Sequence, residues 1–202
     1  MSESREPDQR EIIGYSIRGK ARRERWIAGV RGIAALVKEN GWQHEVVFHG
    51  TSEKHLPFIA SQGVRPTDAG LATEGHALGS FWGDVDTAAA YAEDTVKHRG
   101  GNRPVLLAAR TADLLDRCEA LVPDLSTLDF PLKGLTRLDD AHVYARWVDG
   151  HGYRSLGWRD ALDDLSALVA VHGEPISPDA FAVVDSPEAV TSLLERTFRA
   201  SP

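Results

Sequence analysis

A histidine, a glycine and a threonine follow a short apolar run, and residues of these types in this order could hold a polar ligand. Val46 to Phe48 is best interpreted as a buried strand, so His49 near its end can direct an imidazole into a cleft. Gly50 has no Cβ, and a ligand can therefore approach its backbone closely. The hydroxyl of Thr51 can either donate to a ligand or cap a following helix. Since a lone histidine is more often a core residue, the interpretation needs a second motif.

That second motif runs from Gly79 to Asp84 and continues into an alanine-rich segment ending at Tyr91. Taken together, residues 46–91 resemble the diphtheria-toxin-like and poly(ADP-ribose) polymerase-like branch of the ADP-ribosyltransferases. That branch has a strand ending in His-Gly-Thr/Ser and a helix ending in glycine, here Gly63. A glycine–aromatic strand and a helix with Ala-x-x-Tyr follow, and both occur here in the same order.

The resemblance implies NAD as a substrate and assigns a role to each matching residue. By resemblance, His49 hydrogen-bonds the adenosine ribose, Gly50 holds the nicotinamide carboxamide through its backbone, and Thr51 meets a ribose hydroxyl. Phe81 and Tyr91 match the two rings that sandwich the nicotinamide, which is a cation when oxidised. An aromatic face near such a cation contributes about 0.5–2 kcal/mol. The family more often has tyrosine at the position of Phe81, so stacking is kept and one hydrogen bond is lost.

The transfer reaction also needs a carboxylate, because cleaving the nicotinamide–ribose bond builds positive charge on the ribose carbon. In the family this acid comes from a late strand, but the late strand expected at Ala167–Val171 contains none. Glu174 lies just past its end and is our first candidate, because Gly173 lets the backbone turn toward the cleft. Asp164 and Asp163, just before the strand, are the alternatives. A turn or surface role for Glu174 is the competing interpretation.

Two other chemistries are set aside. The spacing of the histidines at positions 44, 49, 55 and 76 matches no helical or hairpin ligand set, so no metal site is predicted. Cys118 is the only cysteine, which excludes an intrachain disulfide and a thiolate zinc site. It also lacks a histidine–acid pair in any recognised nucleophile motif.

The elements that position these residues follow from periodicity and from capping residues. Strands and helices are mixed without a regular βαβ rhythm, which favours an α+β fold. The resemblance refines this to a split β-sandwich of two small, mostly antiparallel sheets with flanking helices. Strands are predicted at about 45–48, 79–82, 104–109, 167–171 and 180–184. Helices are predicted at about 21–39, 52–61, 85–98, 140–148, 158–165 and from 187, with a short helix capped by Thr111, a loop at 65–78 and irregular structure at 121–137.

Length and composition indicate one domain over residues 11–202 after a disordered tail of residues 1–10. No stretch approaches the roughly 18 apolar residues of a membrane helix, and the polar N-terminus does not match a secretory signal. A cytoplasmic location is expected, or that of a secreted or injected effector. The formal net charge of −7 opposes broad binding to nucleic acid. One basic run is either a solvated helix face or a contact surface for an anionic macromolecule: Arg18, Lys20, Arg22, Arg23 and Arg25.

Three functional hypotheses remain. The first is an NAD-dependent mono-ADP-ribosyltransferase that modifies a protein or nucleic-acid target, as a bacterial or phage toxin or effector with a cognate antitoxin or immunity protein. The second is a catalytically degenerate module of the same fold that binds a nucleotide or a protein partner without turnover. The third is NAD hydrolysis or RNA 2′-phosphate transfer, and the latter needs further basic site residues that the sequence does not offer.

Overall fold

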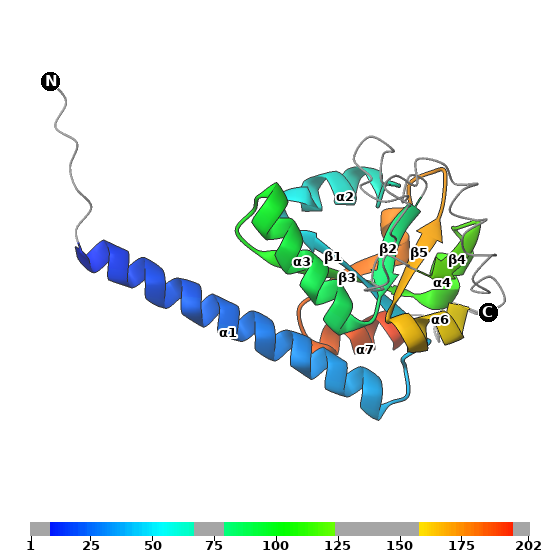
Figure 1. The fold of residues 1–202 in the computed structure, drawn as a ribbon, viewed down its shortest axis with the longest axis horizontal. Helices are drawn as coiled ribbons and strands as arrows, with labels where there is room; N and C mark the ends of the chain where they lie inside the picture. The colour runs from blue at the N-terminus through cyan, green and yellow to red at the C-terminus, as the bar shows by residue number, and fades with distance from the viewer. Residues whose placement is uncertain (1–8, 67–78, 124–157, 196–202) are drawn as a thin grey trace, which may run out of the picture.

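A computed structural model of the chain describes residues 9–66, 79–123 and 158–195 (Figure 1). Its longest element, α1 (Gln9–Glu39), projects well beyond the body, and only its C-terminal part lies against the other elements. The helix starts at Gln9 instead of near residue 21, so residues 9 and 10, predicted as tail, are helical. Val30, Ile33 and Val37 recur at helical spacing and are buried against the body. None of the described helices is long and apolar enough to cross a membrane.

The described strands form one open sheet of six strands in the order β4-β5-β2-β1-β3-β6. Every neighbouring pair in it is antiparallel. The α+β prediction is confirmed, whereas the division into two sheets that the resemblance implied is not observed. A short strand, β4, occupies the start of a stretch predicted to be irregular. The strands are β1 (Val46–Ser52), β2 (Gly79–Gly83), β3 (Pro104–Arg110), β4 (Ala120–Pro123), β5 (Ala167–Val171) and β6 (Phe181–Val184).

Strand β1 is paired very differently on its two sides. Against β3 it forms seven residue pairs, from Val46↔Arg110 to Ser52↔Pro104. Against β2 the register has one pair, Phe48↔Gly83. Strand β2 in turn pairs with β5 along its whole length. The sheet therefore consists of two three-stranded halves joined at one point, beyond which β1 and β2 part.

Helices connect the strands, and most begin and end where the sequence predicts. Ser52 accepts a hydrogen bond from the Lys54 amide and caps the first turn after β1. Asp84 caps α3 by accepting from the Thr87 amide at 2.7 Å. Thr111 was predicted to be a cap, which is wrong, because it lies inside its helix and its hydroxyl caps nothing. The elements are η1 (Glu53–His55), α2 (Leu56–Gln62), α3 (Val85–Arg99), α4 (Thr111–Leu115), α6 (Trp158–Leu165), η4 (Pro178–Ala180) and α7 (Pro187–Glu195).

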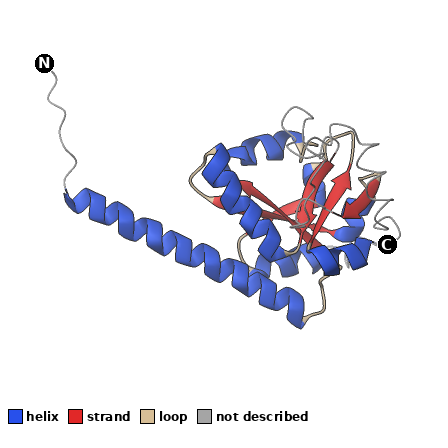
Figure 2. Cartoon of the chain, in the orientation of Figure 1, coloured by secondary structure: helices blue, strands red, loops and turns tan. Residues whose placement is uncertain are grey.

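Helices lie on both faces of the sheet (Figure 2), and each face has its own hydrophobic core. On the α3 face, α1, α3 and α7 cover side chains such as Phe48 and Leu106. On the Trp82 face, residues of α2, α4 and α6 pack around side chains such as Val47 and Trp82. Because successive side chains of a strand alternate between faces, neighbouring residues of β1 and β2 serve different cores. The predicted helix at 140–148 and most of the predicted loop at 65–78 lie outside the described residues.

Candidate functional site

His49 lies on β1 immediately after the last pair with β2. Its Nδ1 is 2.7 Å from the carbonyl oxygen of Phe81, and its ring centroid is 5.4 Å from that of Trp82. A carbonyl oxygen only accepts, so Nδ1 carries the proton and donates. The imidazole thus bonds to β2 where the backbone ladder has stopped. In the neutral ring, Nε2 is left as a hydrogen-bond acceptor.

The surroundings of His49 favour that neutral form. Burial lowers the pKa of His49 below its ordinary value, and the bond to the Phe81 carbonyl opposes this effect only in part. The nearby rings of His55 and His172 lower the pKa of His49 further. At neutral pH, His49 is therefore an uncharged group that can accept a hydrogen bond from a hydroxyl.

Phe81 and Tyr91 form an aromatic pair on the α3 face of the sheet. Their ring centroids are 5.3 Å apart and the ring planes differ by 22°. Inserting a planar ligand between them requires two stacking gaps, a centroid separation of about 7 Å. The pair as it stands leaves no room for a third ring. A sandwiched ligand therefore needs Tyr91 and α3 to move outward, or it stacks on an outer face.

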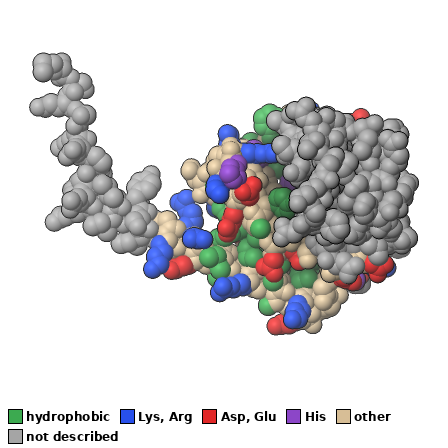
Figure 3. Space-filling model, in the orientation of Figure 1, with side chains coloured by type: hydrophobic (Ala, Val, Ile, Leu, Met, Phe, Trp, Pro, Cys, Tyr) green, Lys and Arg blue, Asp and Glu red, His purple; other side chains and the backbone are tan. Residues whose placement is uncertain are grey.

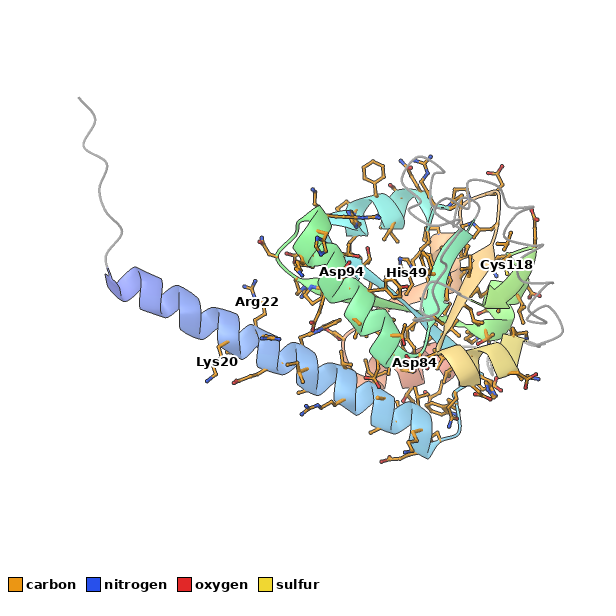
Figure 4. The ribbon with its side chains drawn as sticks, in the orientation of Figure 1. Lys20, Arg22, His49, Asp84, Asp94 and Cys118 are labelled. Carbon is orange, nitrogen blue, oxygen red and sulfur yellow. The ribbon has the colours of Figure 1, made fainter. Side chains whose placement is uncertain are left out.

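The predicted site residues come together from both faces of the sheet. His49 contacts Trp82, whereas the Phe81 ring projects to the opposite face and meets Tyr91 of α3. The Phe81 carbonyl joins the two groups directly. A ligand that touches both must lie in the gap where β1 and β2 part. Figure 4 shows His49 in the interior, behind α3 and close to β2.

The structure shows why residue 50 is a glycine, for a reason that the sequence did not reveal. A Cβ at this position would collide with the backbone carbonyl of Ala88 and crowd the amide of Ala92, both in α3. The glycine therefore lets α3 pack directly on β1, which places Tyr91 beside Phe81. This contact explains the glycine with or without a ligand at its backbone.

Thr51 lies on the same side of β1 as His49 and is buried. Its Oγ1 is 3.2 Å from Nδ1 of His55, in the 3-10 turn that follows β1. Burial, followed by the positive charges of Lys54 and Arg99, lowers the pKa of His55. The threonine hydroxyl thus pairs with a second neutral histidine. Sequence reasoning did not assign His55 to the site.

A buried hydrogen-bond chain on the Trp82 face also escaped sequence reasoning. His172 Nδ1 is 2.7 Å from the carbonyl of Glu174, so it donates there, and its Nε2 accepts from the Ser80 hydroxyl at 2.8 Å. Trp82 Nε1 donates to the same hydroxyl oxygen at 2.9 Å. Burial lowers the pKa of His172, which keeps it in the neutral form that this chain needs. The only sequence signal was the alternation of Ser80 and Trp82 on one strand face.

Two of the candidate carboxylates, Glu174 and Asp163, lie at opposite ends of the sheet. Glu174 lies after β5, at the end of the sheet that also holds Thr51, but its side chain is exposed and only its backbone carbonyl joins the buried chain. Asp163 is 2.7 Å from His44 Nε2, before the start of β1 and therefore at the other end of the sheet. The Asp164 side chain lies outside the described part. On β5, Val169 stands opposite Phe81.

Among the described residues, no group of three or more histidine, cysteine or acidic side chains is arranged to hold a metal ion. Cys118 is a partly buried thiol in the turn between α4 and β4, whereas His49 lies on β1 (Figure 4). Comparison with protein-family models, curated proteins and solved structures finds no match for this chain. The candidate site is therefore defined by its geometry: a neutral histidine, a hydroxyl and an aromatic pair around the gap between β1 and β2.

Proposed function

We propose that the gap between β1 and β2 binds the nicotinamide end of NAD⁺ and that the chain transfers ADP-ribose to a macromolecular target. One observation carries the proposal: the ladder between β1 and β2 stops after a single pair, and a neutral His49 and the Phe81–Tyr91 pair lie at that point. An open ladder offers backbone donors and acceptors to an amide ligand, and the carboxamide of nicotinamide has both.

Each residue at the gap has a role that its chemistry supports. His49 Nε2 accepts a hydrogen bond from a ribose hydroxyl, since Nδ1 is already engaged with the Phe81 carbonyl. Thr51 contributes a hydroxyl on the same side of β1. Tyr91 moves away from Phe81 to admit the cationic nicotinamide ring, whose attraction to an aromatic face offsets part of the lost stacking.

The reaction follows from the charge that develops. The bond between nicotinamide and the ribose carbon breaks, and its electron pair leaves with the nicotinamide nitrogen. A nucleophile of the target then forms a bond to that carbon and releases its proton to the solvent. Glu174 is the proposed carboxylate that stabilises the cationic ribose, which requires its exposed side chain to fold inward over the gap.

A second function is favoured by one specific feature of β5. This strand is entirely apolar, and Val169 stands across from Phe81 where a catalytic strand would present an acid. A site without a carboxylate can bind a nucleotide but does not stabilise the transition state. The alternative is therefore a module that binds a nucleotide or a protein partner without turnover.

Binding is tested by thermal unfolding with and without NAD⁺. A ligand that binds only the native state stabilises it by mass action, and a Kd tenfold below the NAD⁺ concentration adds about 1.4 kcal/mol. We expect a rise in melting temperature that His49→Ala abolishes and Tyr91→Ala reduces. The control is His98→Ala, which removes an exposed histidine of α3. An unchanged melting temperature of the folded wild-type protein at millimolar NAD⁺ would refute both functions that bind this nucleotide.

Turnover is tested by nicotinamide release. We expect Glu174→Gln to lower release at least about tenfold while NAD⁺ affinity changes little, because the acid acts mainly in the transition state. Glu188→Gln, a change of an exposed glutamate on α7, is the matched control. Asp164→Asn tests the alternative acid. Wild-type protein that binds NAD⁺ but releases no nicotinamide with any target mixture would favour the binding module.

A further inference from the structure

A recess lies between the projecting part of α1 and the body, away from the point where β1 and β2 part. It has a volume of about 1080 Å³ and is bounded by α1, α3, the start of β3 and the end of β6. The glycines of α1 explain how the recess is formed. A Cβ at Gly29 would be 2.8 Å from the Asp185 carbonyl oxygen, and one at Gly32 would be 3.1 Å from the Pro187 ring. Helix α1 is thus held closely in its C-terminal half, while its preceding turns stand clear of the body (Figure 1).

The floor of this recess is apolar. Val30 and Ile33 of α1 meet Leu106 of β3 and Val184 of β6 in the core of the α3 face. Partly buried Trp26 extends the apolar surface toward the projecting end of α1. The other four side chains are buried, and the apolar surface that stays open to solvent is that of Trp26, of Val96 in α3 and of Val183 in β6, which is 52% exposed. Apolar surface of this kind in a groove between two helices is typical of sites that receive a third helix.

The rim on α1 is basic. Arg22, Arg23 and Arg25 line the recess and are exposed, and none of them takes part in an ion pair among the described side chains. Lys20 projects from the other side of α1, opposite Arg22 (Figure 4). The space-filling view shows basic side chains along α1 with apolar side chains beside them (Figure 3). This concentration of positive charge contrasts with the net charge of −7 for the whole chain.

The recess also contains acidic groups, and they decide what kind of anion fits. Glu93 accepts a hydrogen bond from Trp26 Nε1 at 2.9 Å, Glu53 pairs with Arg103, and Asp185 lines the same recess. These carboxylates and the net negative charge repel the evenly spaced phosphates of a nucleic acid. An amphipathic polypeptide places apolar side chains on the floor and acidic side chains only at the arginine rim, so it avoids that repulsion.

We propose that this recess is a docking site for an acidic amphipathic helix of a partner protein. Leucine-sized side chains at helical spacing contact Trp26, Val96 and Val183. Glutamate or aspartate side chains of the partner face Arg22, Arg23 and Arg25. The proposal does not depend on NAD⁺ chemistry, because its residues lie outside the gap. Helix α3 is common to both regions: Glu93 lines the recess, while Tyr91 of the same helix stacks on Phe81.

The test measures binding of labelled probes by fluorescence anisotropy, with no NAD⁺ present. The main probe is a synthetic peptide of about five helical turns with leucine at every i, i+3, i+4 and i+7 position of one face and glutamate elsewhere. Four further probes are its lysine-for-glutamate version, its glutamine-for-leucine version, a single-stranded DNA and a double-stranded DNA of equal charge. We expect the leucine–glutamate peptide to bind and the others to bind at least about tenfold more weakly.

Two double variants place the site on the protein. Arg22→Glu with Arg25→Glu is expected to weaken binding of the leucine–glutamate peptide about tenfold. Lys20→Glu with Arg31→Glu makes the same change of charge on the same helix, at exposed positions that do not line the recess, and is expected to leave affinity within about twofold. Circular dichroism confirms that both variants are folded.

Each other outcome overturns the proposal. DNA that binds more tightly than the leucine–glutamate peptide would make the recess a nucleic-acid surface. Equal binding of the leucine and glutamine peptides would reduce the interaction to general charge attraction. An equal loss of peptide affinity in both double variants would show that the recess is not the binding site of the peptide. So would the absence of peptide binding to the folded wild-type protein. None of these outcomes changes the result of the NAD⁺ experiments.

Discussion

The two sides of β1 hold the sheet together by different means. Toward β3, seven residue pairs and apolar side chains such as Leu107 and Ala109 complete the interface. Toward β2 there is one residue pair, and beyond it a polar side chain makes the connection, because His49 bonds to the Phe81 carbonyl. Beside this point, Ser80 joins Trp82 of β2 to His172, which follows β5. In a regular ladder, the backbone N–H and C=O groups of the two strands bond to one another. Where the strands separate, these groups need particular side chains as partners.

The two sides of β1 differ in their capacity to bind a ligand. A fully paired strand boundary has no donors or acceptors left for a ligand, and its residues are replaceable by others of similar shape. The parted boundary needs specific residue types, and it is also where a ligand can meet backbone and side chains together. The two sides should therefore respond differently to substitution.

The largest effect is expected for Gly50→Ala. The added methyl group meets the Ala88 carbonyl, which belongs to a helix backbone and cannot rotate away. Overpacking of this kind lowers the free energy of unfolding by about 3 kcal/mol or more. Urea denaturation measures the change. Gly173→Ala is the control, since a Cβ there has no atom within 4 Å, and it should alter stability by less than about 0.5 kcal/mol. Similar values for the two variants would contradict close packing of α3 on β1.

Ser80→Ala is expected to be the next largest. It leaves the Trp82 indole N–H and His172 Nε2 buried without their common partner, which costs about 1–3 kcal/mol. Chemical denaturation gives the value, and Ser80→Cys, which keeps a weak donor, should recover part of it. Wild-type stability of Ser80→Ala would show that the buried chain is unimportant to the parted side of β1.

A smaller effect is expected from pH. Burial lowers the pKa of His172 in the folded chain below its ordinary value of 6.5, so the unfolded chain binds the proton first. The stability associated with neutral His172 is fully present above about pH 6.5 and is lost as the pH falls below it. Melting temperatures between pH 7.5 and 5 should therefore decrease more steeply for the wild type than for His172→Gln. Parallel curves of melting temperature against pH for the wild type and His172→Gln would contradict a lowered pKa of His172 in the folded chain.

The smallest effect is expected for Thr111→Val, next to the end of β3. Within the described residues, its Oγ1 is the one buried side-chain oxygen or nitrogen without a hydrogen-bond partner. Replacing an unpartnered hydroxyl by a methyl group of the same shape should change the free energy of unfolding by less than about 0.5 kcal/mol or increase it. A loss as large as that of Ser80→Ala, measured under the same conditions, would mean that the two sides of β1 do not differ.

The sequence by itself determined the local elements of this protein. Asp84, the alanine-rich segment and Gly100 predicted the limits of α3, because capping and helix termination depend on neighbouring residues. Apolar runs predicted β2, β3, β5 and β6 for a similar reason. The choice of His49, Phe81 and Tyr91 as one group came from the family that the order and spacing of their motifs resemble, and the structure brings the three together around one carbonyl and one ring stack.

Only the tertiary structure decided how those elements combine. Short β4 has no periodic signal of its own and exists because it pairs with β5. The parting of β1 from β2, the bond between Ser80 and His172, and the pairing of Asp163 with His44 all join residues distant in sequence. Such contacts depend on strand register and on helix placement, which no local pattern encodes. The requirement for glycine at position 50 has the same origin. The sequence shows that this residue has no Cβ, but it does not show that α3 packs where the Cβ would be.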